Sequence, residues 1–315
     1  MPELPEVETV RRGLNQVTLD QEITGGDVLL NRTIAYPLSM EEFLAGVKGS
    51  AITHWHRRGK YLLAELSKER GQGSGVRGQE ESTEATPIQN PKSKIQNLLT
   101  PSLAGCLGVH LRMTGQLLWL HRDDPLHKHT RVRLFFADER ELRFVDQRTF
   151  GQMWWVPPRS VTENVITGLG KLGPDPFSAD FSVEFLARKL QNRRPIKNAL
   201  LDQSVVAGLG NIYADEALFR SGVQPETVCT DLTQQQIERL RTAVIEVLAA
   251  SIAAGGTTFS NFLNVQGING NYGGVAWVYN RAGEPCRVCS TPIQRLRLAG
   301  RSAHFCPQCQ ARGEG

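Results

Sequence analysis

The sequence predicts an α+β fold, with a mostly β N-terminal half and a mostly helical C-terminal half. Short runs that alternate apolar and polar residues fill much of residues 51–156, as expected for half-buried strands. After a proline-rich junction the period changes to that of amphipathic helices, and four cysteines near the end indicate a small metal-binding module. The 315 residues, of which 40% are hydrophobic, suffice for about two domains.

The N-terminal half, residues 1–156, is expected to form one domain built around strands. Strand-like runs separated by glycine and aspartate have the sequences KYLLAEL, GQLLWL, RVRLFF and ELRFVD. Residues 9–14 follow the opening prolines and have the pattern of a helix. We therefore expect a domain of strands with helical flanks.

Residues 67–97 interrupt this pattern. Apolar side chains are rare in the segment, which is rich in Gly, Glu, Gln, Ser and Lys. Such a composition cannot bury enough apolar surface to offset the entropy of ordering the chain. We expect a disordered surface insertion, whose deletion leaves the activity of the protein largely intact.

Prolines mark the junction between the halves at residues 157–176, which we interpret as an interdomain linker. Residues 177–280 are expected to form a helical domain, because helical periodicity covers residues 182–191 and 231–254. The second of these helices has two candidate N-caps, an aspartate and a threonine within its first three residues.

Glycine interrupts the helical domain at two places. Two apolar helical segments are separated by a break that contains Gly208, Gly210 and Asn211, which indicates a turn or a functional site. Residues 255–274 hold six glycines and four asparagines without a charge, so we expect a flexible loop there. A strand-like stretch, residues 275–279, follows it.

Charge is distributed unevenly along the chain. Lys and Arg number 36 against 32 Asp and Glu, and this net charge of +4 does not by itself require a polyanionic partner. Residues 188–197 hold five basic residues and no acid, which alone is typical of a solvated helix face. No run approaches the roughly 18 apolar residues of a membrane span. Because the acidic start also lacks the features of a secretory signal, we expect a cytoplasmic protein without membrane contact.

The cysteines indicate a structural zinc site in residues 281–315. Two Cys-x-x-Cys pairs, with sixteen residues between them, contain Cys286, Cys289, Cys306 and Cys309. Each pair can present two thiolates to one ion, and two pairs complete a tetrahedron. Disulfides or a redox dithiol are the alternative, which the paired spacing and the expected location disfavour. Cys106 and Cys229 lie among apolar residues and are expected to be buried thiols.

The first residues carry a candidate nucleophile. Removal of Met1 before a small residue exposes the secondary amine of Pro2, and an α-amine with a pKa of about 8 is partly neutral at cellular pH. Such an amine can attack an aldehyde-like carbon to give a cationic iminium, which acidifies the neighbouring carbon. Glu3 and Glu6 provide carboxylates for proton transfer. From these residues alone, the alternative is a frayed proline-rich terminus.

The opening residues PELPEVETV resemble the N-terminal signature of the bacterial formamidopyrimidine-DNA glycosylases, repair enzymes that remove oxidised purines. The resemblance continues through HRRGKYLL, HLRMTG, VDQRTFG, LDQSVVAGLGNIYADEAL and the zinc module. It covers nearly the whole chain except residues 67–97, which depart from the compact family pattern. It implies an N-terminal β-sandwich domain with flanking helices, followed by a helical domain with a helix–two-turns–helix motif and a four-cysteine zinc finger.

The resemblance also implies roles for individual residues in catalysis. Pro2 attacks the anomeric carbon of the damaged nucleotide, and Glu3 manages proton transfer as the sugar ring opens. Base loss leaves a covalent iminium, which allows elimination of the 3′ phosphate and afterwards of the 5′ phosphate. Lys60 matches the family lysine of the first elimination, and Arg301 the arginine associated with the second. Without the resemblance, Lys60 is an ordinary strand-edge cation and Arg301 a surface residue of the zinc module.

A DNA interface that extrudes one nucleotide follows from the same resemblance. The residues that fill the void left by the base match Met113, Arg148 and Phe150. The residues expected to contact phosphates are His127, Arg193, Lys197 and Asn211. The loop of residues 255–274 corresponds to the family segment that covers the extruded base. Without the resemblance, Met113 and Phe150 are interpreted as core residues.

The sequence thus predicts a monomeric DNA glycosylase and abasic-site lyase that holds one structural zinc ion. Its expected substrates are 8-oxoguanine and ring-opened purines in damaged double-stranded DNA. Two alternatives remain open. The related endonuclease VIII group prefers oxidised pyrimidines, so excision of 8-oxoguanine and of thymine glycol separates the two activities. A non-catalytic zinc-ribbon protein would instead bind DNA or RNA in a salt-sensitive manner without cleaving the strand.

Overall fold

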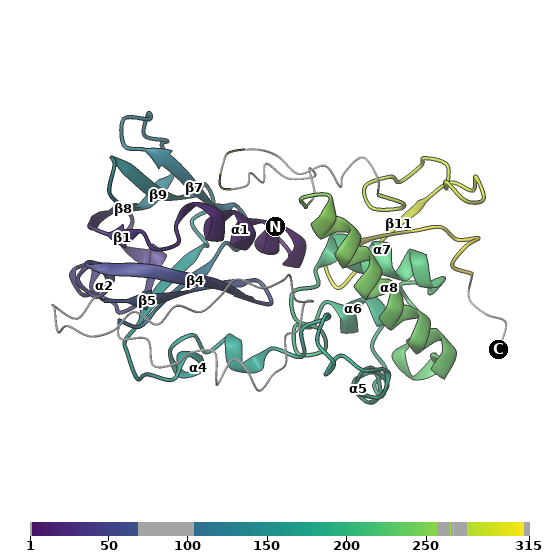
Figure 1. Ribbon diagram of the computed structural model, residues 1–315. Helices are drawn as coiled ribbons and strands as arrows, with labels where there is room; N and C mark the ends of the chain where they lie inside the picture. Colours follow the sequence, from purple (N-terminus) through teal and green to yellow (C-terminus); the bar gives the residue numbers. More distant parts are fainter. Residues whose placement is uncertain (1, 69–103, 257–264, 266, 268–275, 312–315) are drawn as a thin grey trace, which may run out of the picture.

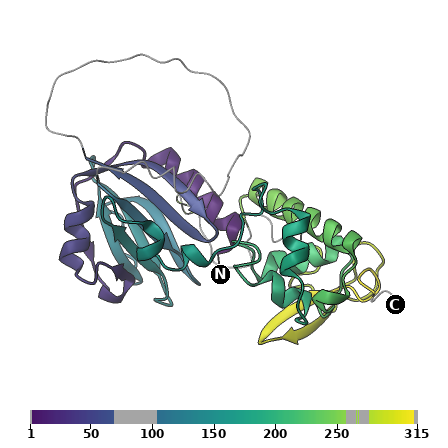
Figure 2. The ribbon, with the colours of Figure 1, turned by 90° about the horizontal axis from the view of Figure 1, so that it is seen from below.

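The computed structural model describes residues 2–68, 104–256, 265, 267 and 276–311. A part built from strands and a part built from helices lie side by side, and the chain begins near their junction (Figure 1, Figure 2). The order of these parts along the chain is the one that the sequence predicts. The arrangement places the chain start where residues of both parts reach it.

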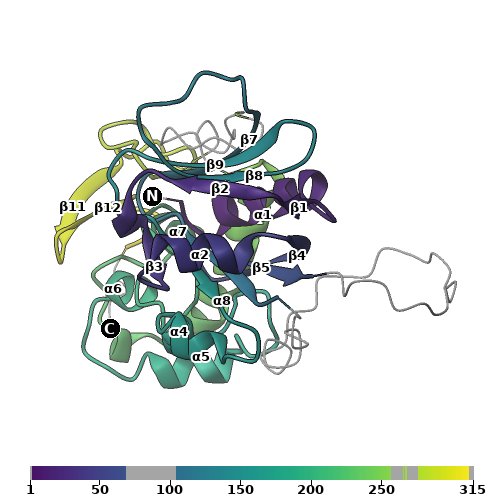
Figure 3. The same ribbon diagram turned by 90° about the vertical axis from the view of Figure 1, so that its left-hand side faces the viewer.

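The N-terminal part is a sandwich of two sheets, which Figure 3 shows as stacked layers. The larger sheet has the strand order β1-β4-β5-β6-β10-β3, and the smaller sheet the order β2-β8-β9-β7. The larger sheet consists of β1 (Glu22–Ile23), β3 (Ile34–Tyr36), β4 (Ser50–Arg58), β5 (Tyr61–Ser67), β6 (Cys106–His110) and β10 (Gln152–Val156). The smaller sheet consists of β2 (Gly25–Val28), β7 (Gly115–His121), β8 (Thr130–Phe135) and β9 (Arg140–Asp146).

The core of this part lies between the two sheets. Strand β8 alternates buried and half-buried side chains, as the apolar and polar pattern of its sequence predicts. Ile52 and Leu62 of the larger sheet share one buried cluster with Leu134 and Phe144 of the smaller sheet. The expected β-sandwich is therefore confirmed. Its other short elements are η1 (Asn31–Thr33) and α2 (Met40–Val47).

Helix α1 (Leu4–Val17) is longer than the helix expected over residues 9–14, because Glu3 and Glu6 cap its start. The backbone amide of Glu3 donates to the Glu6 carboxylate at 2.7 Å. A helix leaves its first amides without intrahelical partners, so this cap stabilises the first turn. The apolar side of the helix packs into the sandwich core through Val7, Val10 and Leu14.

The second part consists of short helices around the long helix α8 (Gln234–Ala253). The others are α5 (Val183–Lys189), α6 (Ile196–Leu200), α7 (Asn211–Ser221) and η3 (Cys229–Asp231). Of the two candidate N-caps of α8, the structure uses Thr233, whose hydroxyl accepts a backbone amide at 3.2 Å. Asp231 ends η3 instead. Among the described residues, no helix has the length and apolar character that a membrane crossing requires.

Residues 157–176 pack onto the larger sheet. They contain α4 (Thr162–Val165) and η2 (Leu169–Lys171). Ile166 joins Tyr61 and Trp154 of the sheet in a small buried cluster, so the predicted linker is itself held in place. Its boundaries stay a prediction.

The stretch at residues 275–279 is not a strand where the structure describes it, so that expectation is wrong. Three consecutive backbone amides, those of residues 277–279, donate to the carboxylate of Glu216 at 2.8, 3.0 and 2.9 Å. Amides that bind a buried carboxylate are not available to a sheet. The strands of this region are β11 (Gln294–Leu298) and β12 (Arg301–Phe305).

Both segments expected to be flexible lie largely outside the described residues. In the expected insertion, residues 67–97, Ser67 is the last residue of β5, and the description stops after residue 68. In the predicted loop, residues 255–274, the description covers four positions. One of these, Val265, is fully buried in the sandwich core. The two expectations of flexibility stay predictions.

Candidate active site

The chain start is buried beneath the glycine-rich turn that precedes α7. Pro2 is buried, and the backbone amide of Leu4 donates to the carbonyl of Gly208 at 3.0 Å. A Cβ added at Gly208, where φ is +91°, would lie 2.8 Å from Leu4. A Cβ at Gly210 would lie 2.2 Å from the carboxyl carbon of Glu3. The break predicted between the two helical segments is therefore the surface on which the chain start packs.

Glu3 is buried at the N-terminus of α7. Glu3 is 2% exposed, and its Oε1 accepts a hydrogen bond from the backbone amide of Ile212 at 3.2 Å. Its Oε2 has no hydrogen-bond partner among the described residues. Burial raises the pKa of Glu3 to about 7, while the positive charge of Lys60 acts in the opposite direction. Such a carboxyl group can hold or release a proton near neutral pH.

A buried polar chain connects Glu6 to the end of α8. The hydroxyl of Tyr213 donates to Glu6 Oε1 at 2.5 Å, and the hydroxyl of Ser251 donates to the Tyr213 oxygen at 2.6 Å. Glu6 also accepts the amide of Glu3, so the chain ends at the candidate acid. Sequence reasoning singled out Glu6 but missed Tyr213 and Ser251, since nothing in the sequence brings them near the chain start.

Lys60 and Arg301, the other two predicted catalytic residues, belong to two other elements. Lys60 lies in the turn between β4 and β5 and is 8% exposed. Burial lowers the pKa of Lys60, the carboxylate of Glu3 opposes this shift, and the guanidinium of Arg301 adds to it. Arg301 is exposed at the start of β12. Pro2 and Glu3 thus lie at the chain start, the charges of Glu3 and Lys60 act on each other, and the charge of Arg301 acts on Lys60.

Lys197 lies inside the protein, although it belongs to a cluster that we expected at the surface. Its ammonium donates to Asp215 at 2.5 Å and also to the backbone carbonyl of Ser302. Asp215 accepts the backbone amide of His304 at 3.0 Å as well. The ion pair therefore joins α6 and α7 to the β11–β12 hairpin. A phosphate contact by Lys197 stays a prediction.

The other predicted phosphate contacts have different surroundings. Asn211 is the first residue of α7, and its amide nitrogen donates to the hydroxyl of Ser302 at 3.5 Å. Its side-chain oxygen is buried without a partner among the described residues. Arg193 is exposed before α6, and His127 is exposed between β7 and β8. Their roles also stay predictions.

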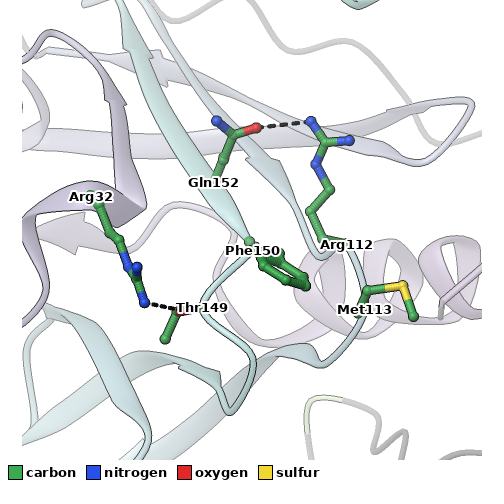
Figure 4. Close-up of a pocket in the computed structure, with 7 residues that line it drawn as sticks. Arg32, Arg112, Met113, Thr149, Phe150 and Gln152 are labelled. Carbon is green, nitrogen blue, oxygen red and sulfur yellow. Dashed lines mark hydrogen bonds between the residues drawn. The ribbon is translucent and has the colours of Figure 1, made fainter.

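Met113 and Phe150 lie on two neighbouring loops of the sandwich (Figure 4). Arg148 lies two residues before Phe150 on the second loop. Phe150 is 53% exposed and Met113 is half-buried, so the interpretation of both as core residues is wrong. The guanidinium carbon of Arg148 lies 5.0 Å from the Phe150 ring centroid, within the range of a cation–π contact. Met113 and Phe150 line a cavity of about 500 Å³, together with Arg32, Arg112, Thr149, Gly151 and Gln152.

One buried carboxylate, Asp146 at the end of β9, holds these two loops together. It accepts the hydroxyl of Thr114 on the first loop and the backbone amide of Gly151 on the second, the latter at 2.7 Å. The Thr114 oxygen in turn accepts the amide of Arg148 at 2.9 Å. Sequence reasoning missed Asp146, although it lies inside the matching VDQRTFG segment.

The four predicted zinc ligands form one cluster. The metal-binding atoms of Cys286, Cys289, Cys306 and Cys309 all lie within 4.8 Å of one another. A tetrahedral zinc site with Zn–S bonds of roughly 2.3 Å has sulfur atoms about 3.8 Å apart. The Sγ atoms of Cys289 and Cys306 are 3.4 Å apart, close to that spacing. All six cysteines of the chain are free, so the disulfide alternative is wrong, and Cys106 and Cys229 are buried as expected.

Family models match three segments of the chain. The formamidopyrimidine-DNA glycosylase N-terminal domain matches residues 1–153, and the H2TH domain of the same proteins matches residues 172–262. A zinc finger found in FPG and IleRS matches residues 283–312. The four cysteines therefore form a structural zinc site, and the segments around α6 and α7 belong to the expected helix–two-turns–helix domain.

Curated formamidopyrimidine-DNA glycosylases are similar to nearly the whole chain. Formamidopyrimidine-DNA glycosylases from Nostoc punctiforme and Trichodesmium erythraeum are 69% and 58% identical to it, over 311 and 320 residues. Each alignment covers 98% of this chain, with 96% of the first relative and 100% of the second.

Solved structures have the same fold. A Lactococcus lactis FPG mutant in complex with a Fapy-dG containing DNA superposes with a TM-score of 0.81 at 31% identity, covering 99% of this chain and 100% of that one. The MutM (FPG) protein from Thermus thermophilus gives a TM-score of 0.78 at 34% identity, with the same coverage. On the strength of these matches and of the site geometry, the chain belongs to the formamidopyrimidine-DNA glycosylase family.

Proposed function

We propose that the protein is a bifunctional base-excision-repair enzyme, a DNA glycosylase and abasic-site lyase that removes oxidised purines from duplex DNA. The observation that carries the proposal is the convergence of a buried Pro2, a carboxyl group with a pKa of about 7 and a buried lysine. The family supports the glycosylase activity on damaged DNA. The residues of the site support the lyase activity.

In the proposed reaction, the neutral nitrogen of Pro2 forms a bond to the anomeric carbon, and the damaged base leaves with the electrons of the glycosidic bond. The departing base takes up the proton that the Pro2 nitrogen loses. Glu3, in its protonated form, donates a proton to the ring oxygen as the sugar opens to the iminium. The pKa of Glu3 near 7 supports this role, because an appreciable fraction stays protonated at neutral pH.

The iminium then withdraws electrons from the neighbouring carbon. Lys60 removes a proton from that carbon, and the 3′ phosphate leaves as the carbon–oxygen bond breaks. The lowered pKa of Lys60 supports its role as a base, since a larger fraction of the amine is neutral. Arg301 assists departure of the 5′ phosphate, and its position at the tip of the β11–β12 hairpin is compatible with a phosphate contact.

Duplex DNA is expected to lie across the exposed loops that carry Met113, Arg148 and Phe150. An exposed aromatic ring beside a guanidinium suits insertion at the void that an extruded nucleotide leaves. His127, Arg193, Lys197 and Asn211 are proposed to contact phosphates. We also propose that the protein acts as a monomer in the cytoplasm, and sedimentation in the absence of DNA tests its monomeric state.

The substrate preference is proposed from the relatives. They are called formamidopyrimidine-DNA glycosylases, and the Lactococcus lactis protein binds a Fapy-dG containing DNA in its crystal structure. A wild-type Lactococcus lactis FPG has also been solved with an oxidised pyrimidine containing DNA. Excision of 8-oxoguanine, a formamidopyrimidine and thymine glycol should therefore be compared side by side. Faster excision of thymine glycol than of either purine would favour the endonuclease VIII alternative.

Borohydride trapping tests the covalent step. On a duplex with 8-oxoguanine, reduction should give a stable protein–DNA adduct, and peptide mapping should place it on the N-terminal residue Pro2. An undamaged duplex of the same sequence is the control. An adduct on another residue contradicts the role of Pro2. Binding of the damaged duplex without adduct or strand cleavage would support the non-catalytic zinc-ribbon alternative.

A further inference from the structure

The turn that carries Lys60 also holds the segment between the two parts of the molecule. It connects β4 to β5, and two adjacent arginines, Arg57 and Arg58, are the last residues of β4 before it. Both side chains extend to residues 172–175, which lead into the helical part. The end of β4, next to the turn, therefore makes direct contact with the connection between the parts.

Arg57 bridges two buried carboxylates. Its Nε donates to Glu8 of α1 at 3.1 Å, and its Nη1 donates to Asp175 at 2.7 Å. All three side chains are less than a tenth exposed. Although burial alone would raise it, hydrogen bonds from Arg11 and the charge of Arg57 lower the pKa of Glu8 to about 2. The planar guanidinium donates in two directions at once, a geometry that a lysine cannot reproduce.

Arg58 fixes the backbone of the same segment. Its Nη2 donates to the carbonyl of Gly173 at 2.6 Å and to that of Leu172 at 3.3 Å. On its other side, the amide of Gly173 donates to the carbonyl of Gln203 at 2.8 Å. A Cβ at Gly173 would lie 2.3 Å from the carbonyl oxygen of Ser204. Residues 172 and 173 are therefore hydrogen-bonded on one side to the end of β4 and on the other to the chain that precedes α7.

We propose that Arg57 is a positioning residue for Lys60, a role that rests on the proposed function. Its bridge ties the end of β4, beside Lys60, to α1, the helix that begins directly after Glu3, and to Asp175 in the segment that leads into the helical part. Without the bridge, the turn can shift although both parts remain folded. Because a displacement of about 1 Å costs a reaction on the order of 100-fold, a small shift of the Lys60 amine slows proton removal.

The variant Arg57→Lys tests this role, since it keeps the charge and removes the two-directional contact. Strand cleavage of a duplex with a preformed abasic site is measured in single turnovers, beside the yield of the borohydride-trapped adduct. The cleavage rate should fall on the order of 10- to 100-fold, whereas the trapped yield and the enzyme concentration that gives half the maximal rate should remain close to those of the wild type. This split separates misplacement of Lys60 from a general loss of folded protein.

Arg133 offers a matched control. It also bridges two carboxylates, donating to Glu141 at 2.7 Å and to Asp27 at 3.3 Å, but all three residues lie in the smaller sheet. Arg133→Lys should cleave the abasic duplex at nearly the wild-type rate, and thermal unfolding of both variants reports their stability. Equal losses of cleavage in the two variants would overturn the inference.

A second variant examines the other end of the bridge. Asp175→Asn keeps the shape of the side chain and removes its charge, so cleavage should fall while trapping persists. The double variant, Asp175→Asn with Arg57→Lys, should lose no more cleavage than Arg57→Lys alone, because both changes break the same contact between residues 57 and 175. If the loss of cleavage in the double variant equals the sum of the losses in the two single variants, the two residues act independently and the inference is contradicted. If the wild type gives no trapped adduct, the proposed function is contradicted. If the wild type is active and Arg57→Lys cleaves at the same rate, only this inference is contradicted.

Discussion

Burial shifts the pKa values of Glu3 and Lys60 in the directions that bring both groups toward neutral pH. The pKa of Glu3 rises to about 7 because the carboxylate is desolvated, and the pKa of Lys60 falls because its ammonium is desolvated. Each group partly offsets the shift of the other through its charge. A carboxyl group with a pKa of about 7 beside a lysine whose pKa is lowered suits a site that both donates and accepts protons.

A stability measurement follows from the burial of Glu3. The unfolded carboxyl group has a pKa of 4.5 and the folded one of about 7, so the free energy of unfolding decreases as pH rises between these values. The decrease is on the order of 3 kcal/mol. Glu3→Gln removes the titration, so this variant should unfold at a higher temperature than the wild type at pH 8 and lose this advantage at pH 4. A constant difference across that range would contradict burial as the cause.

Lys60→Arg separates charge from proton transfer. The guanidinium keeps the positive charge beside Glu3 but does not release its proton at accessible pH. Strand cleavage at a preformed abasic site should therefore slow by roughly 10²- to 10⁴-fold, while borohydride still traps the adduct on Pro2. Gel analysis of single turnovers gives both quantities from one reaction. Unchanged cleavage would exclude Lys60 as the base.

Lys197 illustrates what the sequence does not predict about single residues. It lies in a run of five basic residues without an acid, which is typical of a solvated face. The structure buries it instead against Asp215, eighteen residues later, and the carbonyl of Ser302 at the far end of the chain. The roles given to Pro2 and Glu3 needed the family resemblance, because chemistry alone also allowed a frayed terminus.

At the scale of elements, local signals predicted most helices and strands. The alternation in β8 and the periodicity of α8 are properties of the segments themselves. Expectations failed where a distant residue decides the local backbone. Residues 277–279 alternate like a strand, but their amides bind Glu216, which lies some sixty positions earlier. The start of α1 is set by a capping box of two nearby glutamates. The prolines beside them led us to expect that the helix begins later.

The contact between the two loops at the end of the sandwich also belongs to this scale. Thr114→Val keeps the side-chain volume but removes the hydroxyl that joins Asp146 to the amide of Arg148. Loss of these hydrogen bonds should lower the free energy of unfolding by about 1–3 kcal/mol and weaken binding of a lesion duplex. Thr114→Ser keeps the hydroxyl and serves as the control. Equal binding by the two variants would show that the loops need no such link.

The whole molecule assembles its site from three parts: the sandwich supplies Lys60, the helical part supplies the surface beneath Glu3, and the zinc module supplies Arg301. The sequence predicted these parts from composition and spacing. It did not predict their relative placement, because the contacts that join them, such as Arg57 to Asp175 and Lys197 to Asp215, involve charged residues with no local pattern.

Removal of zinc should disconnect one of these parts. Cys306→Ser, or treatment with a strong chelator, leaves the hairpin of β11 and β12 without its structural ion. DNA binding and strand cleavage should be lost, while circular dichroism retains the signal of the sandwich. The measured zinc content should fall below one ion per chain. Cys229→Ser, at a buried cysteine outside the cluster, is the control. Full activity of the zinc-free protein would contradict a structural role for the ion.

The burial of Pro2 under the Gly208–Gly210 turn has a practical consequence for anyone who prepares this protein. A purification tag fused ahead of the first methionine would prevent its excision, so the proline nitrogen would remain an amide, which has no basic lone pair. Such a sample would fold, load zinc and bind oligonucleotides, yet form no Schiff base. Under the proposed mechanism, affinity tags belong at the other terminus, and incomplete methionine excision during expression would lower the active fraction of a preparation that looks homogeneous on a gel.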